Sequence, residues 1–184
     1  ISFYREALRI KPDYAEGWNN LGSSFQLKKK LDEAVGCYRK ALKIQPNYVE
    51  AIYNMGNVFL EKGELDEAIG FYREVLKLNP DYADAYNNMG NAQQDLGNMI
   101  EAKNCYKKTL EINPKYAEAL YNLHSTSDQI SEARDYLKRC LEINGNHLKA
   151  KLTLAALEVF EGREEFYNAF LDSDLKDHHF VRSI

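Results

Sequence analysis

The fold is decided by residues 49–82, which read VEAIYNMGNVFLEKGELDEAIGFYREVLKLNPDY. Apolar residues recur along this stretch in two stripes, each with the spacing of one helix face. The first stripe holds Ile52, Met55, Gly56 and Phe59, and the second holds Leu65, Ala68, Ile69, Tyr72, Val75 and Leu76. Gly63 lies between them, where a helix can end in a left-handed residue, and Pro80 follows them. The stretch therefore predicts a helix, a short turn and a second helix, which need a neighbouring unit to bury their apolar faces.

The same pattern returns along the chain at a fixed interval of 34 residues. The prolines of the chain keep this interval, and so do one glycine series and two tyrosine series. The four series are Pro12, Pro46, Pro80 and Pro114; Gly22, Gly56 and Gly90; Tyr38, Tyr72 and Tyr106; and Tyr14, Tyr48, Tyr82 and Tyr116. Because four independent series share one period, the chain is predicted to be an internal repeat.

A helix–turn–helix unit of this length resembles the tetratricopeptide repeat, TPR. The resemblance covers at least residues 1–147 and is closest in residues 15–48. The matching residues there are Trp18, Leu21, Gly22, Phe25, Ala34, Tyr38, Ala41 and Pro46. The resemblance implies an all-α protein, an α-solenoid of helix–turn–helix TPR units that forms a right-handed superhelix. In that family the first helices line the concave face of the superhelix and bind peptides there.

The period also divides the chain into segments. These are 1–14, the second helix of a truncated repeat; 15–48, 49–82 and 83–116, three TPR units; 117–147, a degenerate TPR unit; 148–172, a degenerate terminal helix pair; and 173–184, a cap or linker. In the degenerate unit His124 replaces the glycine and three residues are missing before Ala133, so we expect a shortened first helix. Because the chain starts at Ile1 in the middle of a repeat and ends abruptly, we expect it to be a fragment of a longer protein.

The resemblance assigns positions two, five, six, nine, twelve and thirteen of each unit to the concave groove, and the sixth is asparagine in every unit. The predicted peptide-binding residues are Asn19, Asn20, Tyr53, Asn54, Asn57, Asn87, Asn88, Asn91, Tyr121 and Asn122. An amide side chain offers both donors and an acceptor, which pairing with a peptide backbone requires. Tyrosine adds a rigid surface with a polar tip.

A similar series of asparagines lines the repeat region of O-linked N-acetylglucosamine transferase and importin-α, where it holds extended peptides by their backbones. The resemblance implies the same role for this groove. The alternative interpretation is that asparagine at the sixth position is general TPR consensus, shared with repeats that bind other ligands.

The second position of each unit is acidic: Glu16, Glu50, Asp84 and Glu118. These acids favour a partner with basic residues and argue against the TPR clamp that binds chaperone tails through lysine and arginine. A structural explanation competes with this one. In a capping box, Asp13, Asn47 and Asp81 would cap the first helices, and the acid three residues later would complete the box and interact favourably with the helix dipole.

Composition argues against several other classes of protein. The net charge is −4 and there is no basic cluster, so no nucleic-acid partner is predicted. No run approaches the roughly 20 apolar residues of a membrane span. The three cysteines, Cys37, Cys105 and Cys140, are interpreted as packing residues. This interpretation favours a reducing compartment, and the localisation predicted is cytoplasmic.

The sequence predicts no catalytic residue, no cofactor and no metal site. Asp174, Asp177, His178 and His179 form its only local cluster of metal-ligating residue types. Adjacent histidines point in different directions and no third imidazole or cysteine is near, so the cluster is interpreted as a solvated linker.

These observations predict a protein–protein interaction scaffold that binds an extended peptide or partner segment in the concave groove. The alternative is that the chain is the non-catalytic TPR arm of a larger transferase, such as a methyltransferase, glycosyltransferase or sulfotransferase. The open apolar face of residues 1–12 further predicts self-association through the repeat ends.

Overall fold

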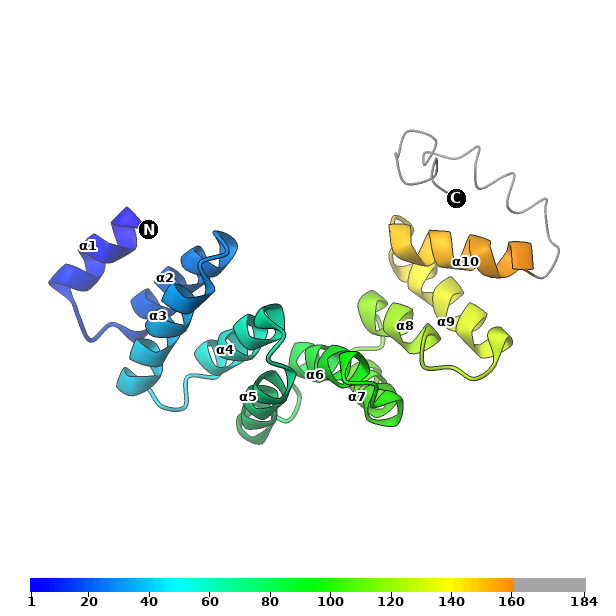
Figure 1. The fold of residues 1–184 in the computed structure, drawn as a ribbon, viewed down its shortest axis with the longest axis horizontal. Coiled ribbons are helices and arrows are strands. Elements are labelled where there is room, and N and C mark those ends of the chain that lie inside the picture. The colour runs from blue at the N-terminus through cyan, green and yellow to red at the C-terminus, as the bar shows by residue number, and fades with distance from the viewer. Residues whose placement is uncertain (161–184) are drawn as a thin grey trace. The chain divides into compact units, whose positions relative to one another are not determined.

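The computed structural model describes residues 1–160, and the regular elements in this range are helices (Figure 1). They are α1 (Ser2–Ile10), α2 (Ala15–Leu27), α3 (Leu31–Ile44), α4 (Val49–Lys62), α5 (Leu65–Leu78), α6 (Ala83–Asp95), α7 (Met99–Ile112), α8 (Ala117–His124), α9 (Ile130–Ile143) and α10 (Leu148–Phe160). The helices pack in sequential pairs, so the predicted all-α repeat array is confirmed. The right-handed superhelix stays a prediction. The second helix of the terminal pair predicted for residues 148–172 lies outside the described residues.

The chain divides into two compact units, Ile1–Asn113 with α1 to α7 and a second unit that begins at Pro114 and contains α8 to α10. In the first unit α2 packs on α3, α4 on α5 and α6 on α7. The first helices of consecutive repeats also touch, α2 with α4 and α4 with α6. In the second unit α9 packs on both α8 and α10. None of the helices within residues 1–160 is long and apolar enough to cross a membrane.

The first helices begin later than a capping box requires. Their N-caps are Tyr14, Tyr48, Tyr82 and Tyr116, and none makes a side-chain cap hydrogen bond. The capping boxes predicted at Asp13, Asn47 and Asp81 are therefore wrong. The reason is a turn before the helix: Tyr82 N–H donates to Asn79 O at 3.3 Å, which places Asp81 inside the turn. The second-position acids still lie in the first helical turn, where the dipole favours them.

The turns inside the repeats contain a left-handed residue. The helix end predicted at Gly63 is confirmed, because this glycine is the C-cap of α4 with a φ of 76°. Gly97 has a φ of 81° at the same repeat position, and Lys29 has a φ of 57°. Left-handed backbone is strained for a residue with a Cβ, so the first repeat has the least favourable of the three turns.

The glycine series and one tyrosine series pack against each other. The three pairs are Gly22 with Tyr38, Gly56 with Tyr72 and Gly90 with Tyr106. A Cβ placed on these glycines would lie 2.5, 2.7 and 2.5 Å from the tyrosine Cε1 atoms, closer than real Cβ atoms approach. Each tyrosine is fully buried. Glycine is thus required because the tyrosine ring of the second helix lies directly against the first helix.

The cysteines and the degenerate unit match the sequence interpretation. Cys37, Cys105 and Cys140 are buried and free, and burial raises the pKa of the latter two thiols to about 11. The shortened helix is confirmed: α8 has 8 residues, whereas α2 and α6 have 13 and α4 has 14.

Candidate functional site

The predicted groove residues of the first unit lie on α2, α4 and α6, the first helices of three consecutive repeats. Those that are half-buried, and so partly open to solvent, are Asn20, Tyr53, Asn54, Asn57, Asn88 and Asn91. We call these six residues the amide surface. Since α4 touches both α2 and α6, the surface is continuous within the unit.

Two of the sixth-position asparagines donate hydrogen bonds to the preceding repeat. Asn54 Nδ2 donates to Asn19 Oδ1 at 3.0 Å. Asn88 Nδ2 donates to the Tyr53 hydroxyl and to Asn57 Oδ1, both at 3.0 Å. These bonds link the first helices of neighbouring repeats. Some of the amide groups that were predicted to bind a peptide therefore already make hydrogen bonds within the protein.

Tyrosine hydroxyls from the second helices support the ninth-position residues. The pairs are Tyr38 with Ser23 at 3.2 Å, Tyr72 with Asn57 at 2.8 Å and Tyr106 with Asn91 at 2.9 Å. Burial raises the pKa of Tyr38 to about 12 and also raises the pKa values of Tyr72 and Tyr106. These hydroxyls thus stay protonated at neutral pH. The buried tyrosine and the surface amide form one connected hydrogen-bond system.

Sequence reasoning missed part of this system. The Tyr38 hydroxyl donates to Gln26 Oε1 at 3.0 Å, and Tyr106 OH lies 2.9 Å from Gln94 Oε1. Gln26 also donates to Glu61 of the next repeat at 2.5 Å. The signal was in the sequence, since Gln26 and Gln94 both occupy the twelfth position of their repeats.

The amide atoms differ in how open they are to a ligand. Asn19 and Asn87 are only 7% and 5% exposed, so they present little surface to a partner and act mainly within the protein. Asn88 Nδ2 already donates to two acceptors. In contrast, the half-buried Asn20 amide makes no side-chain hydrogen bond with another described residue. Asn54 uses one N–H, and its second N–H and its Oδ1 remain available for a ligand. The open capacity therefore lies on α2 and α4.

Exposed acids stand one helical turn before the amide surface. Glu16, Glu50 and Asp84 precede the fifth- and sixth-position residues by three and four residues, a spacing that puts them on the same helix face. Burial, followed by the charges of Glu50 and Glu16, raises the pKa of Tyr48. The negative potential of these acids extends along the start of the first helices.

The remaining predicted residues, Tyr121 and Asn122, lie on α8 in the second unit. Both are half-buried. The Tyr121 ring contacts the rings of His124 and His147, each with centroids 4.8 Å apart. Tyr121 is thus partly engaged by aromatic neighbours within its own unit.

His147 is another residue to which the sequence analysis assigned no role. It is buried, its Nδ1 accepts the Ala150 N–H at 3.1 Å, and its Nε2 lies 3.2 Å from Glu118 Oε1. The first bond caps α10. The signal for this role is positional: once the three missing residues are counted, His147 takes the repeat position of Tyr116, itself an N-cap.

The weak metal-like cluster, Asp174, Asp177, His178 and His179, lies outside the described residues. Within residues 1–160 no group of three or more histidine, cysteine, aspartate or glutamate side chains is arranged to hold a metal ion.

Comparison with known proteins identifies the repeats. A family model described as "TPR repeat" matches residues 27–63 and 56–97, and one described as "Tetratricopeptide repeat" matches residues 83–116. Among curated proteins, none matches this sequence.

Several solved structures share the fold. PilF of Pseudomonas aeruginosa has a TM-score of 0.79 and 23% identity, over 86% of this chain and 73% of its own. A MamA segment from Desulfovibrio magneticus RS-1 has a TM-score of 0.77 and 17% identity, over 89% and 97%. YrrB, described as a TPR protein with an unusual peptide-binding site, has a TM-score of 0.69 and 20% identity, over 95% and 93%.

Proposed function

Because the chain is a tetratricopeptide-repeat protein, we propose that it is an interaction scaffold that binds an extended partner segment on its amide surface. TPR repeats generally serve protein–protein interaction, and peptide binding is attributed to the structural relative YrrB. The observation that carries the proposal is the open hydrogen-bonding capacity of Asn20 and Asn54 on adjacent first helices.

The chemistry of these two amides suits a peptide backbone. Each offers at least one N–H and one carbonyl oxygen, the same pair of groups that every backbone amide presents. Packed helices lie about 8–10 Å apart, and an extended chain advances about 3.3 Å per residue, so the amides would meet roughly every third residue. Recognition of this kind depends little on the side chains of the partner. The acids Glu16 and Glu50 favour lysine and arginine in the segment.

The proposal is tested with peptides selected from a random library by the whole chain. Replacing Asn20 by alanine should weaken the selected peptides about fivefold, because one exposed hydrogen bond contributes about 1 kcal/mol. Asn104→Ala is the matched control, since Asn104 is an exposed asparagine on the second helix α7 and makes no side-chain hydrogen bond with a described residue. Neither change should alter the melting temperature.

N-methylation of single peptide bonds in the selected peptides supplies a second readout. If amides hold the backbone, methylation every third residue should weaken binding while changes of the intervening side chains should not. Selected peptides that bind Asn20→Ala and Asn54→Ala as tightly as the parent chain, or that tolerate every N-methyl group, would overturn the proposal.

The predicted likeness to the asparagine ladder of O-linked N-acetylglucosamine transferase rests on the same residues and stays a prediction. So do the alternative of a transferase arm, the lack of catalytic residues in this chain and self-association through the repeat ends.

A further inference from the structure

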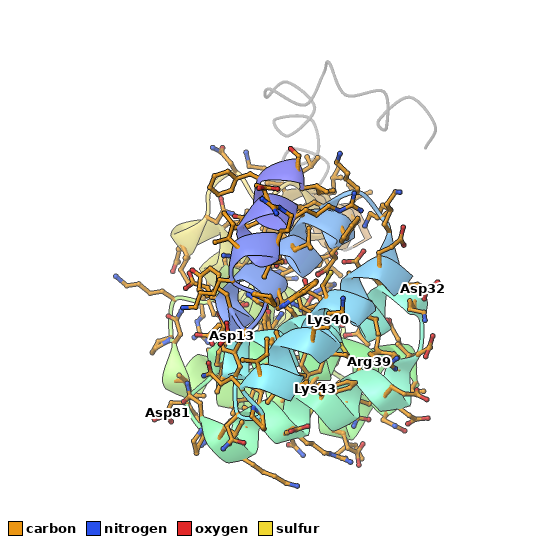
Figure 2. All side chains as sticks on the ribbon, turned by 90° about the vertical axis from the view of Figure 1, so that its left-hand side faces the viewer. Asp13, Asp32, Arg39, Lys40, Lys43 and Asp81 are labelled. Carbon is orange, nitrogen blue, oxygen red and sulfur yellow. The ribbon has the colours of Figure 1, made fainter. Side chains whose placement is uncertain are left out.

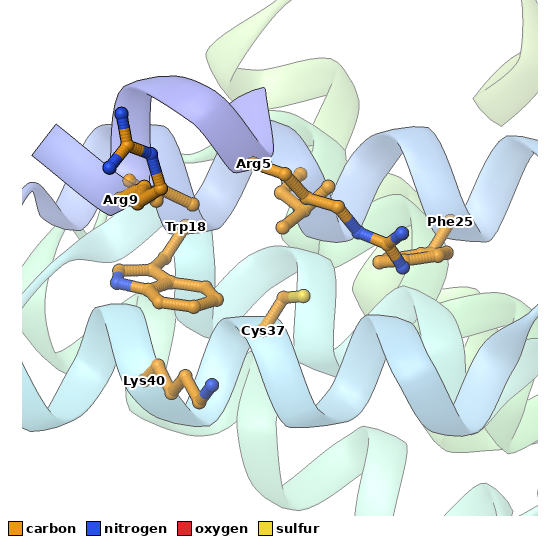
Figure 3. Close-up of a pocket in the computed structure, with 8 residues that line it drawn as sticks. Arg5, Arg9, Trp18, Phe25, Cys37 and Lys40 are labelled. Atoms are coloured by element: carbon orange, nitrogen blue, oxygen red, sulfur yellow. The ribbon is translucent and has the colours of Figure 1, made fainter. Parts of the chain in front are cut away.

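A pocket of about 370 Å³ lies between α1, α2 and α3 (Figure 3). The α2 wall of this pocket consists of Trp18, Leu21 and Phe25, whose spacing of three and four residues puts them on one helix face. The amide surface uses other faces of the same helix, because Asn20 falls between these positions. The volume is within the range of small-ligand sites, and the pocket is separate from the amide surface.

Cations stand directly over the aromatic walls of the pocket. Lys40 Nζ lies 4.1 Å from the centroid of the Trp18 ring, and the Arg5 guanidinium carbon lies 5.7 Å from the centroid of Phe25. Arg5 and Lys40 make no ion pair with an acid among the described residues. The rim of the pocket therefore carries two positive charges that are not ion-paired, and both lie next to its aromatic wall.

One more basic residue lies at this rim. Arg9 lines the pocket and pairs with Glu6 at 2.8 Å on the exposed side of α1. Figure 2 shows Lys40 on α3 together with Arg39 and Lys43, which belong to the same helix but do not line the pocket. The three basic residues that line the pocket, Arg5, Arg9 and Lys40, contrast with the net charge of −4 of the whole chain.

The neighbouring repeat shows what the pocket depends on. Cys37 lines the pocket, and 34 residues later Phe71 takes its repeat position. The Phe71 ring stacks on Phe59, the equivalent of Phe25, with centroids 5.2 Å apart and an interplanar angle of 19°. One repeat thus has a phenyl ring stacked on the first helix at the position where the other has the small Cys37 side chain, and from this we infer that Phe71 fills the equivalent of the space that is open beside Cys37. The positive charge of Lys40 is also specific to the first repeat, because the equivalent residue of the next repeat is Glu74.

We propose that this pocket binds an acidic, apolar peptide segment of a partner protein. An aromatic or large aliphatic side chain enters the space that Phe71 fills in the next repeat, and a neighbouring aspartate or glutamate carboxylate binds Lys40 and Arg5. A protein segment is the occupant favoured over a lipid acid because TPR repeats generally mediate protein–protein interaction. This inference goes beyond the proposed function, since it concerns another face and the opposite ligand charge.

The probe is a tetrapeptide with a leucine–phenylalanine centre flanked by two glutamates, compared with its counterpart flanked by two glutamines. Trp18 is the only tryptophan of the chain and lines the pocket, so its fluorescence reports occupancy directly. The glutamate peptide should bind saturably to the full chain. The glutamine peptide should bind about tenfold more weakly, because it keeps the shape and loses the charge.

Two variants that copy the neighbouring repeat test the site. Cys37→Phe should abolish the fluorescence change by filling the cavity, and Lys40→Glu should weaken the glutamate peptide about tenfold or more. Lys43→Glu is the control, with the same charge change on an exposed residue of the same helix that does not line the pocket. It should change affinity less than twofold. If Cys37→Phe loses its helical circular dichroism signal, the test rests on Lys40→Glu, which changes an exposed residue and should not disturb folding.

The proposal fails if Lys40→Glu and Lys43→Glu weaken binding equally, or if folded Cys37→Phe binds as tightly as the parent chain. Octanoate is the probe that tests whether the pocket binds a lipid acid instead. Saturable binding of octanoate, with no binding of the glutamate peptide, would assign the pocket to a lipid acid and overturn the proposal.

Discussion

The three regular repeats of the first unit and the degenerate repeat of the second pack their paired helices differently. In the second repeat of the chain, Gly56 leaves room for the Tyr72 ring, which is fully buried. In the degenerate repeat His124 takes the glycine position, and Leu137, also fully buried, takes the tyrosine position. Because leucine is smaller than tyrosine, the first helix of this repeat no longer needs a glycine.

The same difference reaches the surface. The Tyr72 hydroxyl donates to Asn57, which in turn accepts from Asn88 of the next repeat. In the degenerate repeat Leu137 has no hydroxyl, and the ninth-position residue Ser125 donates to its own helix, to the Asn122 backbone oxygen at 2.8 Å. The amide surface is therefore supported from below by the buried tyrosines, and glycine, tyrosine and ninth-position amide change together.

The largest expected effect is that of high pH, which should destabilise the regular repeats through a buried tyrosine that the degenerate repeat lacks. It acts on Tyr38, Tyr72 and Tyr106 at once, whereas the degenerate repeat has Leu137 at this position. Burial raises the pKa of Tyr38 to about 12, against 10.0 for an unburied tyrosine, and shifts Tyr72 and Tyr106 in the same direction. The unfolded chain loses these protons near pH 10, whereas the folded chain keeps them. The contribution of these tyrosines to the free energy of unfolding is thus constant below pH 10 and falls as pH rises from 10 towards 12, by about 1.4 kcal/mol per pH unit for each tyrosine.

Urea unfolding followed by Trp18 fluorescence measures this loss in the first unit. Tyr38→Phe removes one titrating group and should make the fall between pH 10 and 12 shallower. Equal stability of the parent chain at pH 9 and pH 11 would contradict the prediction.

An intermediate effect is expected from Gly56→Ala. The new Cβ would lie 2.7 Å from Tyr72 Cε1, so overpacking should cost about 1–3 kcal/mol, although alanine is the better helix former by about 1 kcal/mol. In a Tyr72→Leu background, which copies Leu137, the same change should be neutral or stabilising. A double-mutant cycle by urea unfolding measures the coupling. The same penalty in both backgrounds would show that the tyrosine ring is not the obstacle.

The smallest effect concerns the turn of the first repeat. Lys29 has a φ of 57° where the next two repeats have glycine, so Lys29→Gly should relieve about 1 kcal/mol of backbone strain. The change also removes the exposed ion pair with Glu61 at 2.7 Å, which contributes less than about 1 kcal/mol. We expect a net gain of about 0.5 kcal/mol. Lys28→Gly, at a φ of −90°, is the control, and an equal gain there would contradict the strain argument.

Sequence reasoning succeeded where a local pattern was sufficient. Helix pairs, the helix end at Gly63, the packing role of the cysteines and the shortened α8 all follow from spacing or from residues missing within one repeat. It failed at the capping boxes, because the turn that ends at Tyr82 shifts the helix start by one residue. A pattern of residue types does not reveal a shift of this size.

The sequence by itself determined that this chain is a repeat of paired helices, since periodic apolar residues specify helix faces without reference to any distant contact. It also marked the asparagines at the sixth position. Only the tertiary structure decided which amides stay open: Asn19 is buried, Asn88 is committed to the preceding repeat, and Asn20 is free of side-chain bonds to described residues. Only it showed that Cys37 lines a pocket, whereas Phe71 at the same position of the next repeat stacks on Phe59. Both outcomes depend on distances between helices, and residue spacing along one helix does not determine those distances.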